Sequence, residues 1–213
     1  MLSDNLSIGY SSLLAKNLKI TGFLLLFLSA LISKAGEEVR KYEIRVAGIH
    51  IGDMIAKKKT QDTLTIYSLD SNVSIWIFYS IKVHYTITSA YHSDQLLYSI
   101  VTTTTNKGNF NTSTIWNRDH YQVKVNAYKY KKDTVIRGPI RFNMARMYFE
   151  EPTVSIKLLS DNYGLILTPE KLDHNSWRCV LMGKPNQFYF SNGKLQRAQM
   201  YNPIKNFEVR LKE

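Results

Sequence analysis

The histidines are the first side chains to test for chemistry, because imidazole binds metal ions and transfers protons near neutral pH. Two histidines that share one metal ion usually follow the spacing HxH or HExxH. That spacing occurs at none of the five positions, which are His50, His84, His92, His120 and His174. His84 is predicted on the polar face of a strand, and His120 and His174 in turns. The histidines therefore predict neither a metal site nor a catalytic base.

The other reactive groups also lack a catalytic spacing. A serine hydrolase usually carries its nucleophile in a Gly-x-Ser-x-Gly turn, and no such segment occurs. Gly48-Ile-His-Ile-Gly52 lacks the pattern of a phosphate-binding loop and is predicted to bend a hairpin. Glu150 and Glu151 are adjacent, so on a strand they would point to opposite faces, and we interpret them as the charged end of a helix. We predict no catalytic residue, no metal site and no cofactor.

The first 35 residues predict the compartment. Lys16-Asn-Leu-Lys19 precedes an apolar run from Ile20 to Ile32, and Ser33-Lys34-Ala35 follows it. This order is typical of a secretory signal helix that is cleaved after Ala35, and the run is short for a membrane span. We expect a periplasmic or secreted protein that is not stably transmembrane after cleavage. Two alternatives remain open: a retained anchor, and a translation start downstream of Met1.

Length and composition predict one domain, residues 36–213, in a chain of 213 residues. The only cysteine, Cys179, excludes an intramolecular disulfide, so the fold must rest on its hydrophobic core. Trp177, Cys179 and Leu181 share a strand face, which predicts a buried thiol.

The net charge of +11 gives the chain a basic surface, with clusters at Lys57, Lys58 and Lys59 and at Lys129, Lys131 and Lys132. Export argues against nucleic acid, so anionic lipid headgroups or acidic glycans are the candidate partners of a basic surface. The alternative is that these lysines protect exposed strand edges.

Beyond residue 38 the apolar residues alternate with a period of two, which is typical of strands with one buried face. Ile75 to Ile87 is predicted to form one long strand, with Trp76 and Phe78 covered at its start. The segments that start at Tyr42, Tyr121 and Phe207 alternate in the same way. Thr102 to Thr105 is predicted to lie in an exposed strand.

Turns and one helix complete the predicted fold. Ser191-Asn-Gly-Lys194 predicts a hairpin with a type I′ turn, and similar punctuation recurs along the chain. Many antiparallel strands in one sheet must curl, so we expect a mainly β protein that forms a barrel or half-barrel. Met144, Met147 and Tyr148 share a helical face and predict a short helix within 141–149; another strand is the alternative.

Three functions fit these elements. In the first, the curled sheet holds a lipid or other apolar molecule, with Trp76, Phe78, Met144, Met147 and Tyr148 as the candidate contacts. In the second, a solid core presents an outer surface to another envelope protein. The third, an enzyme, would have to join His84 and His120 with Asp119 or Glu150 in one cleft. The first function is preferred.

Several segments also resemble a known family: Tyr42 to Gly52, Gly138-Pro-Ile140, Met147 to Pro152, Ser191 to Leu195, Asn202-Pro-Ile204 and Phe207 to Leu211. From about residue 39 onward they resemble an exported β-rich family of unknown function, from Gram-negative bacteria of the Bacteroidota type. The first strand with Gly48-x-x-x-Gly52, followed by a mid-chain helix, is more distantly similar to a barrel family reminiscent of lipoprotein carriers. The resemblance implies an exported antiparallel barrel and no catalytic residues.

Overall fold

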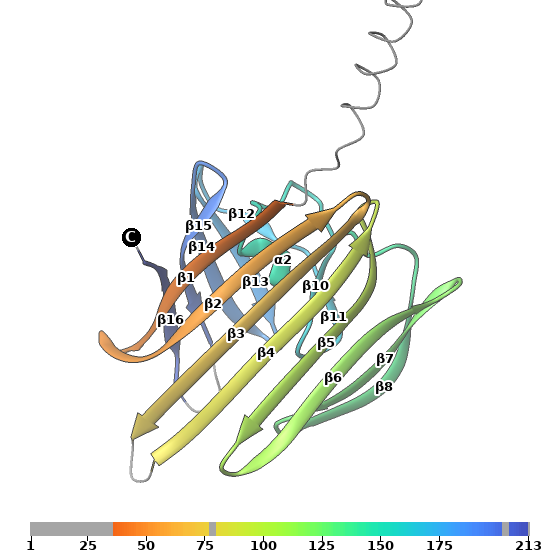
Figure 1. Ribbon diagram of the computed structural model, residues 1–213. Coiled ribbons are helices and arrows are strands. Elements are labelled where there is room, and N and C mark those ends of the chain that lie inside the picture. The colour runs from red at the N-terminus through yellow and green to blue at the C-terminus, as the bar shows by residue number, and fades with distance from the viewer. Residues whose placement is uncertain (1–35, 77–79, 202–204, 213) are drawn as a thin grey trace, which may run out of the picture. The chain divides into compact units, whose positions relative to one another are not determined.

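Strands dominate the computed structural model, which describes residues 36–76, 80–201 and 205–212 (Figure 1). Thirteen strands form one sheet in the order β12-β13-β14-β15-β16-β1-β2-β3-β4-β5-β6-β7-β8, and a second sheet has the order β11-β10-β9. The bounds are β1 Gly36–Val46, β2 Ile49–Gln61, β3 Leu64–Trp76, β4 Ser80–His92, β5 Gln95–Thr105, β6 Gly108–Asn117, β7 His120–Ala127, β8 Tyr130–Arg137, β9 Phe142–Asn143, α2 Met144–Met147, β10 Leu158–Ser160, β11 Leu165–Leu167, β12 Glu170–Lys171, β13 Ser176–Leu181, β14 Lys184–Ser191, β15 Lys194–Met200 and β16 Phe207–Leu211.

The large sheet is an open barrel. Neighbours in sequence pair antiparallel from β1 to β8 and from β12 to β16, and the last strand pairs with the first, with Ile44 opposite Val209. β8 and β12 remain the two edges, so the sheet is not closed. Figure 1 shows strands β1 to β5 in front, the strands β13 to β15 behind them, and α2 between the two groups. The predicted fold class, a curled antiparallel sheet with one short helix, is confirmed.

Alternation places the predicted residues in the core. Tyr42 and Ile44 of β1 and Tyr121 and Val123 of β7 are buried, and all four belong to one hydrophobic cluster. Cys179 is also buried in this cluster, as predicted. Burial raises the pKa of its thiol to about 12, which leaves the sulfur protonated and unreactive at neutral pH.

The prediction of one strand from Ile75 to Ile87 is wrong. β3 ends at Trp76 and β4 begins at Ser80, so this segment is the end of a hairpin in which Ile75 lies opposite Ile81. Paired residues of antiparallel strands point to the same face, so the period of two continues through the reversal and hides it. Phe78 and the predicted signal helix lie outside the described residues.

Two predicted turns are confirmed. Asn192 and Gly193 have φ angles of 49° and 70°, as a type I′ turn requires. The second is the bend predicted at Gly48 to Gly52, where β1 ends at Val46 and β2 begins at Ile49. Near this bend, the register of β1 and β2 shifts after Ile44. There a Cβ atom on Gly52 would lie 2.1 Å from the carbonyl oxygen of Asn72, so glycine is needed for the close approach of β2 and β3.

The connection between β8 and β12, residues 138–169, fills the concave side of the sheet, and we call it the inner segment. Met147, Tyr148, Leu158 and Leu159 are buried in the same cluster as Tyr42 of the sheet. The predicted helix is confirmed but is shorter than 141–149, because Phe142 and Asn143 pair with β10 and the side chain of Asn143 caps α2. Within the described residues, no helix is long and apolar enough to cross a membrane.

Candidate functional site

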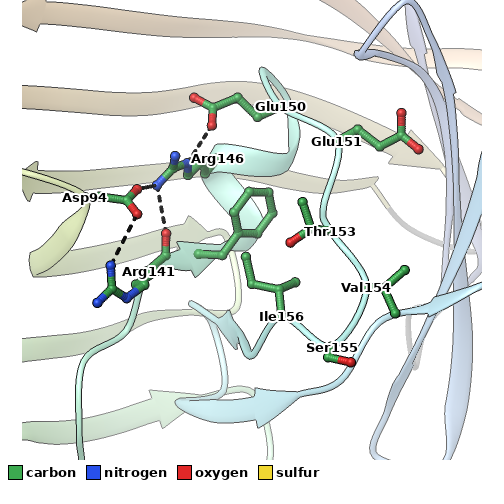
Figure 2. Close-up of a pocket in the computed structure, with 10 residues that line it drawn as sticks. Asp94, Arg141, Arg146, Glu150, Glu151, Thr153, Val154, Ser155 and Ile156 are labelled. Atoms are coloured by element: carbon green, nitrogen blue, oxygen red, sulfur yellow. Dashed lines mark hydrogen bonds and ion pairs between the residues drawn. The ribbon is translucent and has the colours of Figure 1, made fainter.

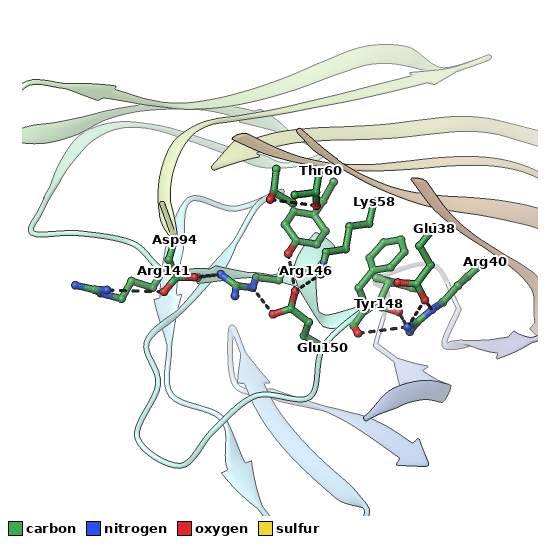
Figure 3. Close-up of polar contacts among 12 residues, drawn as sticks. Glu38, Arg40, Lys58, Thr60, Asp94, Arg141, Arg146, Tyr148 and Glu150 are labelled. Carbon is green, nitrogen blue, oxygen red and sulfur yellow. Dashed lines mark hydrogen bonds and ion pairs between the residues drawn. The ribbon is translucent and has the colours of Figure 1, made fainter. Parts of the chain in front are cut away.

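A chain of charged side chains crosses the end of the open barrel near α2 (Figure 3). Arg146 of α2 donates from Nε to Glu150 Oε2 at 2.8 Å, and its Nη1 pairs with Asp94 in the turn between β4 and β5. Glu150 Oε1 in turn accepts from Lys58 Nζ at 2.8 Å and from the Tyr67 hydroxyl at 2.6 Å. The cluster thus joins α2 to β2, β3 and the β4–β5 turn.

The Glu150 carboxylate is ionised in this cluster. Partial burial favours its neutral form, but the hydrogen bonds from Lys58, Tyr67 and Arg146 outweigh burial and lower the pKa to about 2. Burial and the same carboxylate raise the pKa of Tyr67, and the pKa of Arg146 is also raised despite its burial. Since these three groups do not titrate near pH 7, the cluster is suited to holding a geometry and not to proton transfer.

A surface pocket of about 490 Å³ lies beside these charges (Figure 2). Its polar side carries Asp94, Arg141, Arg146 and Glu150, and Arg141 Nη1 lies 3.7 Å from Asp94 Oδ2. The other side is formed by Phe142 and the loop after the helix, with Glu151, Thr153, Val154, Ser155 and Ile156. Asp94, Arg141, Arg146 and Glu150 pair with each other, so these four charges of the pocket largely neutralise one another.

A second polar cluster is buried between the sheet and the inner segment. Asp161 Oδ1 accepts from the Ser99 hydroxyl at 2.5 Å and from Asn143 Nδ2 at 2.7 Å, and Oδ2 accepts from the Ala145 backbone at 3.3 Å. Asn143 Nδ2 also donates to the Ser89 hydroxyl at 2.8 Å. Burial raises the pKa of Asp161 to about 6, although these hydrogen bonds favour the charged form.

Among the predicted ligand contacts that the structure describes, Trp76 does not lie beside Met144, Met147 and Tyr148. Trp76 is exposed at the end of β3, whereas α2 lies near Tyr67 of the same strand. Those two residues are nine positions apart along the strand, which corresponds to roughly 30 Å. Met147 and Tyr148 are buried in the core and Met144 is half-buried. Phe78 lies outside the described residues.

The two predicted lysine clusters lie in different settings. Lys57 and Lys59 are exposed on the outer face of β2, while Lys58 pairs with Glu150. Because β2 lies between β1 and β3, the interpretation of this first cluster as edge protection is wrong. Lys131 and Lys132 do lie on the edge strand β8, where they line a surface pocket of about 450 Å³ with Lys124.

Three of the histidines, His50, His84 and His120, each lie beside an aspartate, and the adjacent glutamates bind different partners. His84 Nε2 lies 3.1 Å from Asp70 Oδ1, and His120 Nδ1 lies 2.7 Å from Asp119 Oδ1. Glu151 accepts from Trp177 Nε1 at 2.8 Å and so points away from the Glu150 cluster. Among the residues that the structure describes, no group of His, Cys, Asp or Glu side chains is arranged to hold a metal ion.

Sequence reasoning missed Asp94, Arg146 and Asp161. Their partners are Glu150 and Asn143 together with residues of distant strands, and no local spacing indicates such contacts. The one usable signal was a polar pair, Ser160-Asp161, directly after the apolar Leu158 and Leu159.

Fold and site together define a β-barrel-like domain with a filled concave side. Residues 42–212 match the family described as Domain of unknown function (DUF6134), and the chain belongs to this family. A solved structure, a beta-barrel-like protein of domain of unknown function DUF1849 from Brucella abortus, is similar with a TM-score of 0.51. The two are 10% identical, and the match covers 85% of this chain and 98% of that one. At this identity the similarity shows the fold alone. No curated protein matches.

Proposed function

We propose that this protein is an exported, non-catalytic module of the cell envelope that works through its outer surface. The observation that carries the proposal is the filled interior: Tyr42, Tyr121, Trp177 and Phe188 of the sheet pack with Met147 of the inner segment. The signal-peptide pattern up to Ala35 supports export. The Bacteroidota-type source and the likeness to lipoprotein carriers stay predictions from the resemblance.

Binding of a lipid inside the sheet has less support. The inner segment occupies the side of the sheet that such a ligand would need, and its buried residues would have to leave the core first. Native mass spectrometry of protein purified from its own envelope tests this choice. We expect the mass of the bare polypeptide, and a co-purified lipid would restore the internal site as the function.

Export is tested in the native host by cell fractionation and N-terminal sequencing. We expect the protein in the envelope fraction with Gly36 as its first residue. A cytosolic protein that keeps residues 1–35 would overturn the proposal, because a module of the envelope must leave the cytosol.

A further inference from the structure

The connections between strands fall into two groups at opposite ends of the open barrel. In an antiparallel meander, successive hairpin turns alternate between the two ends, and the pairing registers fix which turn belongs to which end. One end carries the turns after β1, β5, β7 and β13, together with the ends of β3 and β15. We call it the apolar end; in Figure 1 it is the lower end of the front strands.

Exposed apolar side chains gather at the apolar end. Trp76 at the end of β3 is 76% exposed, and Ile49 at the start of the neighbouring β2 is 69% exposed. Met182 is 56%, Tyr128 49% and Tyr201 39% exposed. Trp76, Tyr128 and Tyr201 are also the exposed aromatic residues of the described chain. Exposed apolar residues scattered singly are ordinary, but the recurrence of large ones in turn after turn at one end is not.

Lysines surround these apolar side chains. The ammonium groups of Lys129 and Lys184 lie 5.3 Å and 5.2 Å from the ring centroids of Tyr128 and Tyr201. Lys82 and Lys205 are exposed at the same end. Aromatic rings mixed with lysine are the composition that proteins place at the boundary between water and lipid, where the ring enters the interface and the ammonium meets an anionic headgroup.

The opposite end has a different composition. Its two-residue turns are Asp62-Thr63, Ser93-Asp94, Arg118-Asp119 and Asn192-Gly193. Asp62 and Asp119 are exposed there, and carboxylates would be repelled by anionic lipids. Arg118 and Lys194 are exposed at this end too, as is the apolar Leu64. The clear difference between the two ends is that the exposed aromatic side chains of the described residues all lie at the apolar end.

We propose that the apolar end docks on the surface of a membrane that contains anionic lipids, with Trp76 and Ile49 entering the interface and Lys129 and Lys184 contacting headgroups. This inference rests on the proposed envelope function and names the partner of the outer surface. The turns lie flat on the membrane in this arrangement, and the strands do not cross it.

Vesicle sedimentation tests the docking, with the protein recovered from the envelope of its host. The probes are vesicles of phosphatidylethanolamine with 30% phosphatidylglycerol, and vesicles of phosphatidylcholine alone, at about 0.1 M and 0.5 M salt, where exposed charges are screened to different extents. We expect tighter binding to the anionic vesicles, and a loss of that preference at the higher salt.

Variants then locate the surface. The double variant Ile49→Ser/Trp76→Ser and the double variant Lys129→Gln/Lys184→Gln should each weaken binding to anionic vesicles by more than about tenfold. Val154→Ser is the matched control, because Val154 is 73% exposed on the loop after α2 and outside the apolar end. It should bind like the wild type. On binding, tryptophan emission should shift to shorter wavelength, and Trp76→Phe should remove the shift.

Equal binding of the wild type and both double variants would overturn the docking surface, as would a Val154→Ser variant that is weakened equally. Equal binding to the two vesicle types would overturn the anionic partner. If the protein is exported but binds neither vesicle, the docking fails while the proposed envelope function stands. If the protein stays in the cytosol with its leader, the envelope function itself fails.

Discussion

At the scale of single residues, the two polar clusters differ in how their carboxylates are held. Glu150 is partly exposed and meets three donors, so its negative charge is stabilised. Asp161 is buried, and although it also accepts several hydrogen bonds, the loss of hydration raises its pKa to about 6. The two carboxylates should therefore affect stability in opposite directions as the pH changes.

Replacement of Asp161 by asparagine tests the buried carboxylate. Its folded-state pKa of about 6 exceeds the ordinary value of 3.8, so the folded protein holds a proton that the unfolded chain releases between these values. Protonation therefore stabilises the fold at low pH, and that contribution is lost as the pH rises through about 6. From about pH 4 to pH 7, the unfolding free energy of the wild type should fall relative to Asp161→Asn by on the order of 3 kcal/mol.

Urea titrations at several pH values measure this difference, and Asp62→Asn, which removes an exposed carboxylate, is the control. The asparagine variant loses some stability at every pH, because its amide places a donor where donors already point. The test of the Asp161 pKa is therefore how the difference in unfolding free energy between the two proteins changes with pH. If this difference in unfolding free energy is the same at every pH, the pKa of Asp161 is the same in the folded and the unfolded state.

Glu150→Gln should destabilise the fold by about 2–3 kcal/mol near pH 7. It leaves Lys58 without its counter-charge in a partly buried place, and it leaves Arg146 with Asp94 alone. The pKa is lowered from 4.5 to about 2, so this stabilisation is present above about pH 5 and disappears as the pH falls towards 2. The deficit of the variant should shrink over the same range. Denaturant titration measures both effects.

Glu170→Gln is the matched control for Glu150→Gln. Glu170 also pairs with an arginine, Arg178, at 2.6 Å, but both side chains are exposed. Its loss should cost less than about 1 kcal/mol. Equal losses in the two variants would contradict a special role for the Glu150 cluster.

At the scale of elements, local patterns gave most strands correctly because burial of one face imposes the period of two. The same logic failed between Ile75 and Ile87, because the apolar residues of β3 and β4 on either side of the turn lie on the same face of the sheet. The helix was predictable from Met144, Met147 and Tyr148, but its partner strand β10 was not, since the parallel pair of Phe142 with Leu158 joins distant segments. The sequence did not predict the site residues Asp94 and Asp161 for the same reason, because their contacts depend on the tertiary fold.

The turn between β10 and β11 shows how tightly the inner segment meets the sheet. Gly164 has a φ of 58°, and a Cβ atom there would lie 2.4 Å from Val123 Cγ1 on β7. Gly183 in the β13–β14 turn has a φ of 76° with nothing within 4 Å of a Cβ atom. Both positions favour glycine, but only Gly164 faces a packed surface.

Gly164→Ala should therefore destabilise the protein more than Gly183→Ala. The shared backbone strain costs about 1–2 kcal/mol in each variant, and the clash with β7 should add about 1–3 kcal/mol at Gly164 alone. Thermal or urea unfolding of the two variants gives the comparison directly. Should Gly183→Ala lose as much stability as Gly164→Ala, the inner segment would have room to move away from Val123.

At the scale of the whole molecule, the inner segment is part of the core and not a lid on a finished barrel. It supplies Met147, Leu158 and Leu159 to the same cluster as the sheet, and the Asp161 and Glu150 clusters add polar contacts at two places. An open sheet of this size has an exposed concave side unless something covers it, so the sheet and the inner segment should be stable only together.

This mutual dependence predicts one cooperative unfolding transition. Trp177 of β13 reports on the contact, because it is buried and its Nε1 donates to Glu151 of the inner segment at 2.8 Å. In a Trp76→Phe/Trp116→Phe background, Trp177 fluorescence and far-ultraviolet circular dichroism should change at the same urea concentration. Glu151→Gln should move both midpoints downward together. A fluorescence change that precedes the loss of strand signal would show instead that the inner segment detaches from a sheet that survives without it.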